Sequence, residues 1–206
     1  MTQNDMAIRI KNFFQNPAYY SNTDVNDSIQ DGYDEVVALS GCILKATKLP
    51  FTAGLSYYDM ISLIPDYLGV YAIYNTAIKR FMLPGSIRKF DLDRIDWETA
   101  TGVPYYFSVV SHRYMAIYKK PVVSNYGNMY IYYKAIAPTL ASGDAIMIPE
   151  DIIDQTLEDY CISDLWEQNQ EWGKAAVHLN AYGEGLQVLK DIVNGRQPDR
   201  LPQLRG

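Results

Sequence analysis

Four carboxylates gather in the segment "DLDRIDWE", which holds Asp91, Asp93, Asp96 and Glu98. Paired carboxylates beside aromatic rings are the groups that glycosidases use as general acid and as nucleophile or base. Acidic residues are equally typical of the first turn of a helix, because the positive end of the helix dipole attracts them. The segment has the apolar spacing of a short helix, so we expect these acids to stabilise that helix rather than to catalyse a reaction.

The histidines and cysteines do not form a recognisable site. His112 and His178 are far apart in the sequence and neither is next to a cysteine, whereas metal ligands recur at short spacing. The chain has no G-x-S-x-G nucleophile motif and no glycine-rich phosphate loop. Cys42 and Cys161 fall in apolar helical patterns, which indicates buried free thiols. We therefore expect no catalytic residue, no metal ion and no cofactor.

Tyrosine is the unusual component, with 18 residues against 6 Phe and 3 Trp. Tyr118, Tyr126, Tyr130 and Tyr132 lie in and between two β-patterns, "RYMAIYKK" and "NMYIYYKAI", which predict the two arms of a hairpin. Alternation places Tyr130 and Tyr132 on the face opposite Ile131. Tyrosine is enriched at protein interfaces, so we expect these four residues to form a contact surface for other proteins. A carbohydrate-binding module that stacks sugars on exposed tyrosines is the alternative.

Charge is distributed unevenly along the chain. The net charge of −6 argues against binding nucleic acid by neutralising its phosphates. Residues 150–171 contain no Lys or Arg. Their acids include Glu150, Asp154, Glu158, Asp164, Glu167 and Glu171. Such a helix is either an ordinary solvated face or a surface that repels polyanions and meets basic partners.

The last residues have the opposite character. After Gly195 the chain is basic and contains two prolines, and it carries Arg196, Arg200, Leu201, Leu204 and Arg205. Without apolar periodicity it is expected to be an extended tail, which is either disordered or ordered by docking on a neighbouring protein.

The periodicity of apolar residues predicts helices at both ends of the chain and strands between them. Helices are expected over residues 3–15, 24–47 with Thr23 as N-cap, 149–172 and 174–194, and short strands over residues 52–147. The predicted fold class is α+β: a helical bundle (1–51 and 148–195) with an inserted antiparallel β-rich module (52–147) and an extended C-terminal tail (196–206). No basic-then-apolar leader and no membrane-length apolar run occur, so we expect synthesis in the cytoplasm and no membrane partner.

Three stretches taken in order resemble the head-to-tail connector (portal adaptor) proteins of tailed bacteriophages. They are an N-terminal helix pair ending near "KATKLPF", the strand-rich middle, and "IPEDIIDQTLEDYCISDLW" with the helix after it. The matching positions are Trp97, Gly102, Pro104, Tyr106, Pro121, Tyr132, Tyr133, Pro149, Glu150 and Tyr182. These residues mark turns, strand ends and helix starts, and they do not form a set of catalytic residues.

The resemblance implies a structural virion protein that is not an enzyme. Such proteins form a ring, commonly of twelve copies, in the neck between the capsid portal and the tail or further neck proteins. By this reading the C-terminal tail docks on the portal, and the acidic helix faces the channel through which double-stranded DNA passes without specific binding. The tyrosines would then form an inter-subunit or tail-facing surface.

Overall fold

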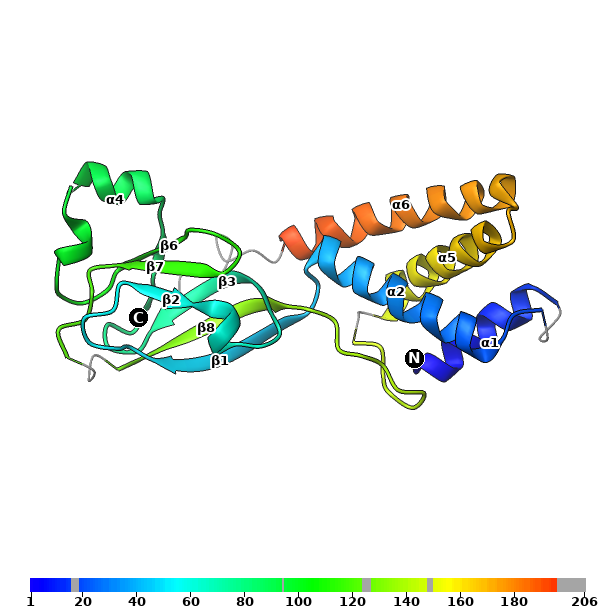
Figure 1. Cartoon of the computed structure of the whole chain (residues 1–206), viewed down its shortest axis with the longest axis horizontal. Coiled ribbons are helices and arrows are strands. Elements are labelled where there is room, and N and C mark those ends of the chain that lie inside the picture. The colour runs from blue at the N-terminus through cyan, green and yellow to red at the C-terminus, as the bar shows by residue number, and fades with distance from the viewer. Residues whose placement is uncertain (16–18, 94, 124–126, 148–149, 196–206) are drawn as a thin grey trace. The chain divides into compact units, whose positions relative to one another are not determined.

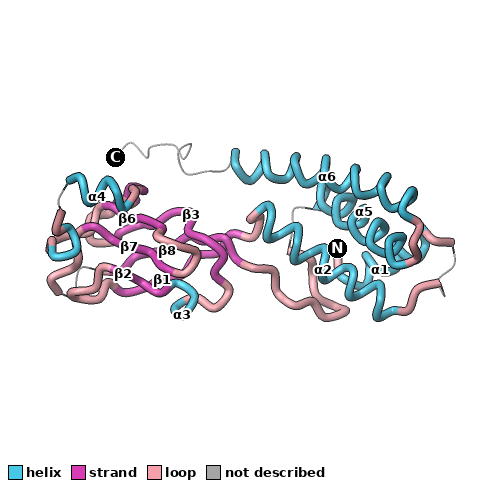
Figure 2. Tube along the Cα trace, turned by 45° about the horizontal axis from the view of Figure 1, so that its top comes forward, coloured by secondary structure: helices cyan, strands magenta, loops and turns pink. Residues whose placement is uncertain are grey.

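The computed structural model describes residues 1–206 except 16–18, 94, 124–126, 148–149 and 196–206. It divides into two compact units, Met1–Ile43 with Ile136–Gly206, and Leu44–Ala135. The first unit is helical and the second is rich in strands (Figures 1 and 2). The predicted α+β class is therefore confirmed. The domain bounds expected from the sequence, with a helical bundle over residues 1–51 and 148–195 and a β-rich module over residues 52–147, stay a prediction.

The described residues of the helical unit form four helices: α1 (Gln3–Phe13), α2 (Asn22–Ser40), α5 (Glu150–Gln168) and α6 (Trp172–Gly195). α1 and α2 each begin at a capping box, in which Thr2 or Ser21 accepts a backbone N–H and an Asp three residues later bonds back. Ser21, and not the expected Thr23, is the N-cap of α2. The cap lies two residues earlier because Asp24 completes the reciprocal pair only with Ser21.

α5 packs against α6, α2 and α1 and is the central helix of the unit (Figure 1). Glycines on both neighbours allow this close approach. A Cβ at Gly32 of α2 would lie 2.5 Å from Tyr160 Cδ1 and 2.8 Å from Leu157 Cδ1. A Cβ at Gly185 of α6 would overlap the Oγ1 of Thr156. Both contacts are closer than carbon atoms tolerate, so these two positions require glycine if the helices are to keep this spacing.

The end of α2 corrects the sequence-based prediction. The helix was expected to continue to Thr47, but it ends at Ser40, and Gly41 follows with a φ of 62° in the left-handed region. This αL residue bonds back to Val37 O at 2.8 Å and closes the helix. The following residues form a strand, and Cys42 lies between the two elements instead of within a helix.

The β unit contains two four-stranded sheets. In the first, the order is β1 (Leu44–Pro50), β8 (Asn128–Ala135), β3 (Tyr67–Asn75) and β4 (Arg80–Phe81). In the second, it is β2 (Tyr57–Asp59), β7 (Tyr114–Tyr118), β6 (Tyr106–Val109) and β5 (Leu83–Pro84). All neighbours are antiparallel except β5 and β6. α3 (Met60–Leu63), α4 (Ile87–Asp93) and the 3₁₀ helix η1 (Trp97–Thr99) lie in the connections.

The predicted hairpin between "RYMAIYKK" and "NMYIYYKAI" is wrong. These segments are β7 and β8, and they belong to different sheets: β8 pairs with β1 and β3, whereas β7 pairs with β2 and β6. Each sheet has one buried side, formed by Met129 and Ile131 on β8 and by Met115 and Ile117 on β7. These buried side chains are part of the core of the β unit.

The outer side of the second sheet is covered by α4 and η1. Phe90 of α4 and Trp97 of η1 pack on Ala116 of β7, with Tyr106 and Tyr118 beside them. These outward positions of β6 and β7 alternate with the inward ones, as the two-residue period of a strand requires. The outer side of the first sheet is not covered in this way, because its outward tyrosines are exposed.

Candidate interaction surfaces

The outer side of the first sheet presents a row of aromatic rings. Tyr130 on β8 lies opposite Tyr74 on β3, and Tyr74 lies opposite Phe81 on β4. Tyr132 follows two residues later on the same face, and its ring centroid is 6.1 Å from that of Phe81. On the other flank, Lys48 of β1 lies opposite Tyr130, with its Nζ 6.0 Å from the ring centroid. We call these five residues the tyrosine face.

The tyrosine face is exposed and its polar atoms are unpaired. Phe81, Tyr130 and Tyr132 are 44%, 38% and 37% exposed. Among the described residues, no hydrogen-bond partner occurs for the hydroxyls of Tyr74, Tyr130 or Tyr132. The four strands β1, β8, β3 and β4 contain no Asp or Glu. Alternation places Lys48 and Lys134 on the same side of the sheet as Tyr130 and Tyr132, whereas Lys45 is on the other side and pairs with Asp66 at 2.6 Å. The face is thus aromatic, basic and rich in hydroxyl donors.

The structure brings together only two of the four tyrosines expected to form one surface. Tyr130 and Tyr132 are neighbours, as alternation predicted. Tyr118 lies on the outer side of the other sheet, where its ring stacks on Phe90 at 5.4 Å, and Tyr126 lies outside the described residues. Tyr74 and Phe81 were missed because only the strand register, which the sequence does not show, places them beside Tyr130.

Tyr118 instead lines a pocket of about 350 Å³. Its other lining residues are Leu83, Tyr105, Tyr106 and Lys119. Lys89 of α4 lies over the ring of Tyr106 at 5.0 Å, so the pocket is at the base of α4.

Two of the four carboxylates of "DLDRIDWE", those of Asp91 and Glu98, accept hydrogen bonds from aromatic side chains. Trp97 Nε1 donates to Asp91 Oδ1 at 2.9 Å, and the Tyr57 hydroxyl donates to Glu98 Oε1 at 2.5 Å. Burial, together with this bond to Glu98, raises the pKa of Tyr57 to about 12. Because aromatic donors occupy both carboxylates, their role is to fix η1 against β2 and α4. No group of three or more His, Cys, Asp or Glu that could hold a metal occurs in the described parts of the chain.

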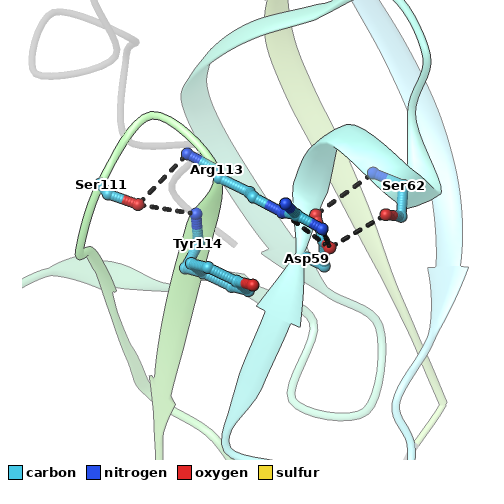
Figure 3. A network of polar contacts seen from close by, with 5 residues as sticks. All are labelled: Asp59, Ser62, Ser111, Arg113 and Tyr114. Atoms are coloured by element: carbon cyan, nitrogen blue, oxygen red, sulfur yellow. Dashed lines mark hydrogen bonds and ion pairs between the residues drawn. The ribbon is translucent and has the colours of Figure 1, made fainter.

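A second charged cluster ties β7 to the start of α3 (Figure 3). Arg113 donates from Nε and Nη2 to Asp59 Oδ2 at 2.9 and 2.5 Å. Asp59 also caps α3 through the backbone N–H and hydroxyl of Ser62, at 3.3 and 2.9 Å. The bond from Arg113 holds the pKa of Asp59 at about 2, well below its ordinary value of 3.8. Both partners are at the surface, so the cluster is a clamp between two elements and not a buried acid–base pair.

The acidic helix α5 is less available than its composition suggests. Arg9 of α1 bridges Asp154 at 3.3 Å and Glu158 at 2.7 Å. Glu171 lies 3.5 Å from Lys174, and Asp164 accepts a bond from Gln168 at 3.0 Å. Glu167 is exposed, and the side chain of Glu150 lies outside what the structure describes.

A more exposed acidic row lies on α2, and it was not among the residues expected from the sequence. Asp24, Asp27, Asp31 and Asp34 are all exposed, and their spacing of three, four and three residues places them on one face. α2 contains no Lys or Arg, and no described residue pairs Asp27 or Asp31 with a cation. The D-x2-D-x3-D-x2-D spacing in the sequence is the signal that could have identified this acidic row.

The remaining candidates are structural or lie outside the described part. Cys42 and Cys161 are free thiols, and burial raises the pKa of both. His178 bonds to Asp159 at 2.7 Å within the helical unit. The tail residues Arg196, Arg200, Leu201, Leu204 and Arg205 lie outside the described residues. In the described helices, no segment is both long and apolar enough to cross a membrane.

The comparison with protein families gives one result that covers almost the whole chain. A sequence model of the SU10 adaptor protein family matches residues 1–203. No curated protein sequence matches the chain. The matched region includes both units, the tyrosine face and the acidic rows on α2 and α5. The resemblance to phage head-to-tail connectors is thereby confirmed, and the chain belongs to the SU10 adaptor protein family.

Proposed function

We propose that copies of this chain form a ring, of twelve copies, between the portal and the tail of a tailed phage. The observation that carries the proposal is the family match over residues 1–203, which gives the chain a structural adaptor role in a phage. The described surfaces support it, because they offer exposed aromatic and charged contact surfaces and structurally occupied carboxylates rather than a reaction centre.

The proposal includes a DNA channel at the centre of the ring. An acidic wall suits this role, because repulsion of phosphates keeps the duplex from sticking while it moves. The acidic row of α2 is a better candidate for such a wall than the carboxylates of α5. Glu167 of α5, which is exposed, would add to the negative charge of the wall. Arg9 already neutralises two of the α5 carboxylates, Asp154 and Glu158.

The basic C-terminal tail is proposed to dock on the portal. Its three arginines and two leucines supply charge and apolar anchors for a groove on that partner. A chain that ends at Gly195 would then keep its fold and lose binding to the portal. The Arg200→Gln and Arg205→Gln double variant should weaken binding less than the truncation.

Native mass spectrometry and electron-microscopy class averages of the purified protein, alone and mixed with the portal protein of the same virus, test the ring. We expect closed rings of twelve copies on the portal. A protein that stays monomeric in the presence of that portal would overturn the proposal.

The wall is tested in the assembled ring by replacing Asp24, Asp27, Asp31 and Asp34 with Asn. We expect DNA to be retained more strongly, with a dependence on salt. The four Asp→Glu replacements keep the charge and are the matched control. Unchanged DNA retention in the Asn variant would exclude α2 as the channel wall.

A further inference from the structure

The segment after Phe90 presents two aliphatic side chains to solvent. Leu92 at the end of α4 is 78% exposed and Ile95 before η1 is 94% exposed. Asp91, Asp93 and Asp96 flank them. Residues 91–98 contain four acids and one Arg, so the segment is acidic as well as apolar. We call Leu92, Ile95 and these three acids the α4 tip.

The described residues on either side of the tip are anchored by buried aromatic side chains. Phe90 and Trp97 on either side of it are 1% and 2% exposed, with their ring centroids 5.2 Å apart. The Trp97 Nε1 bond to Asp91 adds a polar link across the segment. Large apolar side chains held in solvent on a fixed support are typical of anchor residues that a partner covers.

The tyrosine face is complementary to the α4 tip in two ways: its aromatic rings suit the aliphatic side chains of the tip, and its positive charge suits the acids of the tip. It is a flat row of rings flanked by Lys48, with Lys134 farther along β8, and its strands contain no acid. Aromatic faces suit aliphatic anchors, and unpaired phenol hydroxyls suit carboxylate acceptors. The tip supplies both of these groups.

The tip and the tyrosine face lie on opposite outer sides of the same β unit. α4 and η1 cover the outer side of the second sheet, through Phe90 and Trp97 on Ala116. The tyrosine face is the outer side of the first sheet. Two different complementary patches on opposite sides cannot satisfy each other within one unit. Between copies they form a head-to-tail contact, which is the kind that generates rings.

We propose that the α4 tip of one copy docks on the tyrosine face of the next copy. Leu92 and Ile95 cover the rings of Phe81, Tyr130 and Tyr132, and Asp93 meets Lys48 and Lys134. This contact rests on the proposed ring, for which it supplies one heterologous interface.

The pocket at Tyr105, Tyr106 and Tyr118 is the other aromatic surface of the unit. It lies at the base of α4, on the same sheet as the tip, as the contact of Lys89 with Tyr106 shows. A tip that docked there in a second copy would use one side of both units, which gives a closed two-fold pair and not a ring.

Cross-linking between two differently labelled proteins tests the contact in the assembly on the portal. One protein carries Ile95→Cys and the other Tyr132→Cys, both in a Cys42→Ser background that leaves only the fully buried Cys161. A short bis-maleimide should join the two proteins to each other and should not join either to itself. A single chain with both cysteines should give a ladder up to the full ring.

A second experiment measures assembly after the aliphatic anchors or the charged residues of the proposed contact are replaced. Leu92→Ser with Ile95→Ser should weaken assembly about tenfold or more, as loss of central anchors does. Leu63→Ser, an exposed leucine on α3, is the matched control and should assemble like the unchanged chain. Lys48→Glu and Asp93→Lys should each weaken assembly, and mixing or combining them should restore part of it.

The outcomes separate this inference from the proposed function. Rings that assemble normally with both serine replacements, or that give no cross-link between residues 95 and 132, overturn the contact and leave the ring proposal intact. A cross-link of the Ile95→Cys protein to itself also overturns it, since that is a two-fold contact. A chain that does not assemble on the portal at all overturns both.

Discussion

The close packing of α5 against α6 leads to a quantitative prediction for two glycines on the same helix. An added Cβ at Gly185 would meet the Oγ1 of Thr156 and lie 3.1 Å from its Cβ and Cγ2. An added Cβ at Gly183 would meet nothing within 4 Å. Thr156 is buried in the interface between the helices, so it cannot move aside without moving α5.

The two alanine variants therefore differ only in the packing cost. Each replacement gains about 1 kcal/mol of helix propensity. Overpacking a close contact costs about 1–3 kcal/mol. We expect Gly183→Ala to raise the free energy of unfolding by about 1 kcal/mol. Gly185→Ala should lower it by up to about 2 kcal/mol, because the packing cost offsets or exceeds the gain. The difference between the two variants, about 1–3 kcal/mol, measures the overlap with Thr156 alone.

Urea denaturation followed by circular dichroism is the assay, with the free energy obtained by linear extrapolation. Adding Thr156→Ala to Gly185→Ala removes Oγ1 and Cγ2 and should recover part of the loss, which appears as a favourable coupling in the double-mutant cycle. The reasoning would be refuted if Gly185→Ala proved as stable as Gly183→Ala. It would also be refuted if Thr156→Ala added its own cost without any coupling.

Two further predictions concern the ends of elements. Ser21→Ala removes the N-cap of α2 and should cost about 1 kcal/mol of unfolding free energy, whereas Thr23→Ala should change it little; equal effects in urea denaturation would contradict the assigned cap. The pKa of Asp59 is about 2 in the folded chain against 3.8, so its stabilising effect is complete above pH 4 and is lost as the pH falls toward 2. Arg113→Gln should therefore lower the melting temperature at pH 6 and converge with the unchanged chain near pH 2; a constant difference would exclude the clamp.

The sequence predicted the elements whose signals are local. The helices α1, α5 and α6 follow from apolar periodicity, and the alternation of β8 correctly separates Tyr130 and Tyr132 from Ile131. These predictions hold because neighbours on a helix face or a strand side are fixed by a short repeat. The carboxylates near Trp97 were expected at the start of a short helix, and this is wrong: α4 begins at Ile87 and ends at Asp93, so Asp91 and Asp93 lie in its last turn.

Errors appeared wherever a distant part of the chain decides the outcome. Residues 44–47 were assigned to a helix, although Gly41 was available as a stop signal, because the strand they form is stabilised by pairing with β8. The two β-patterns "RYMAIYKK" and "NMYIYYKAI" are close in the sequence and were predicted to pair, but β7 and β8 both find partners elsewhere in the chain. Strand pairing depends on which partner completes a buried sheet, and turn residues alone do not contain that information.

The sequence by itself determined the α+β class, the family and the positions of the aromatic and charged residues along the chain. Only the tertiary structure decided which of these residues share a surface. It separated Tyr118 from Tyr130, added Tyr74 and Phe81, paired Asp154 and Glu158 with Arg9, and left the α2 aspartates exposed. The physical reason is that exposure and pairing arise from contacts between residues far apart in the chain, whereas composition and periodicity describe only their neighbours.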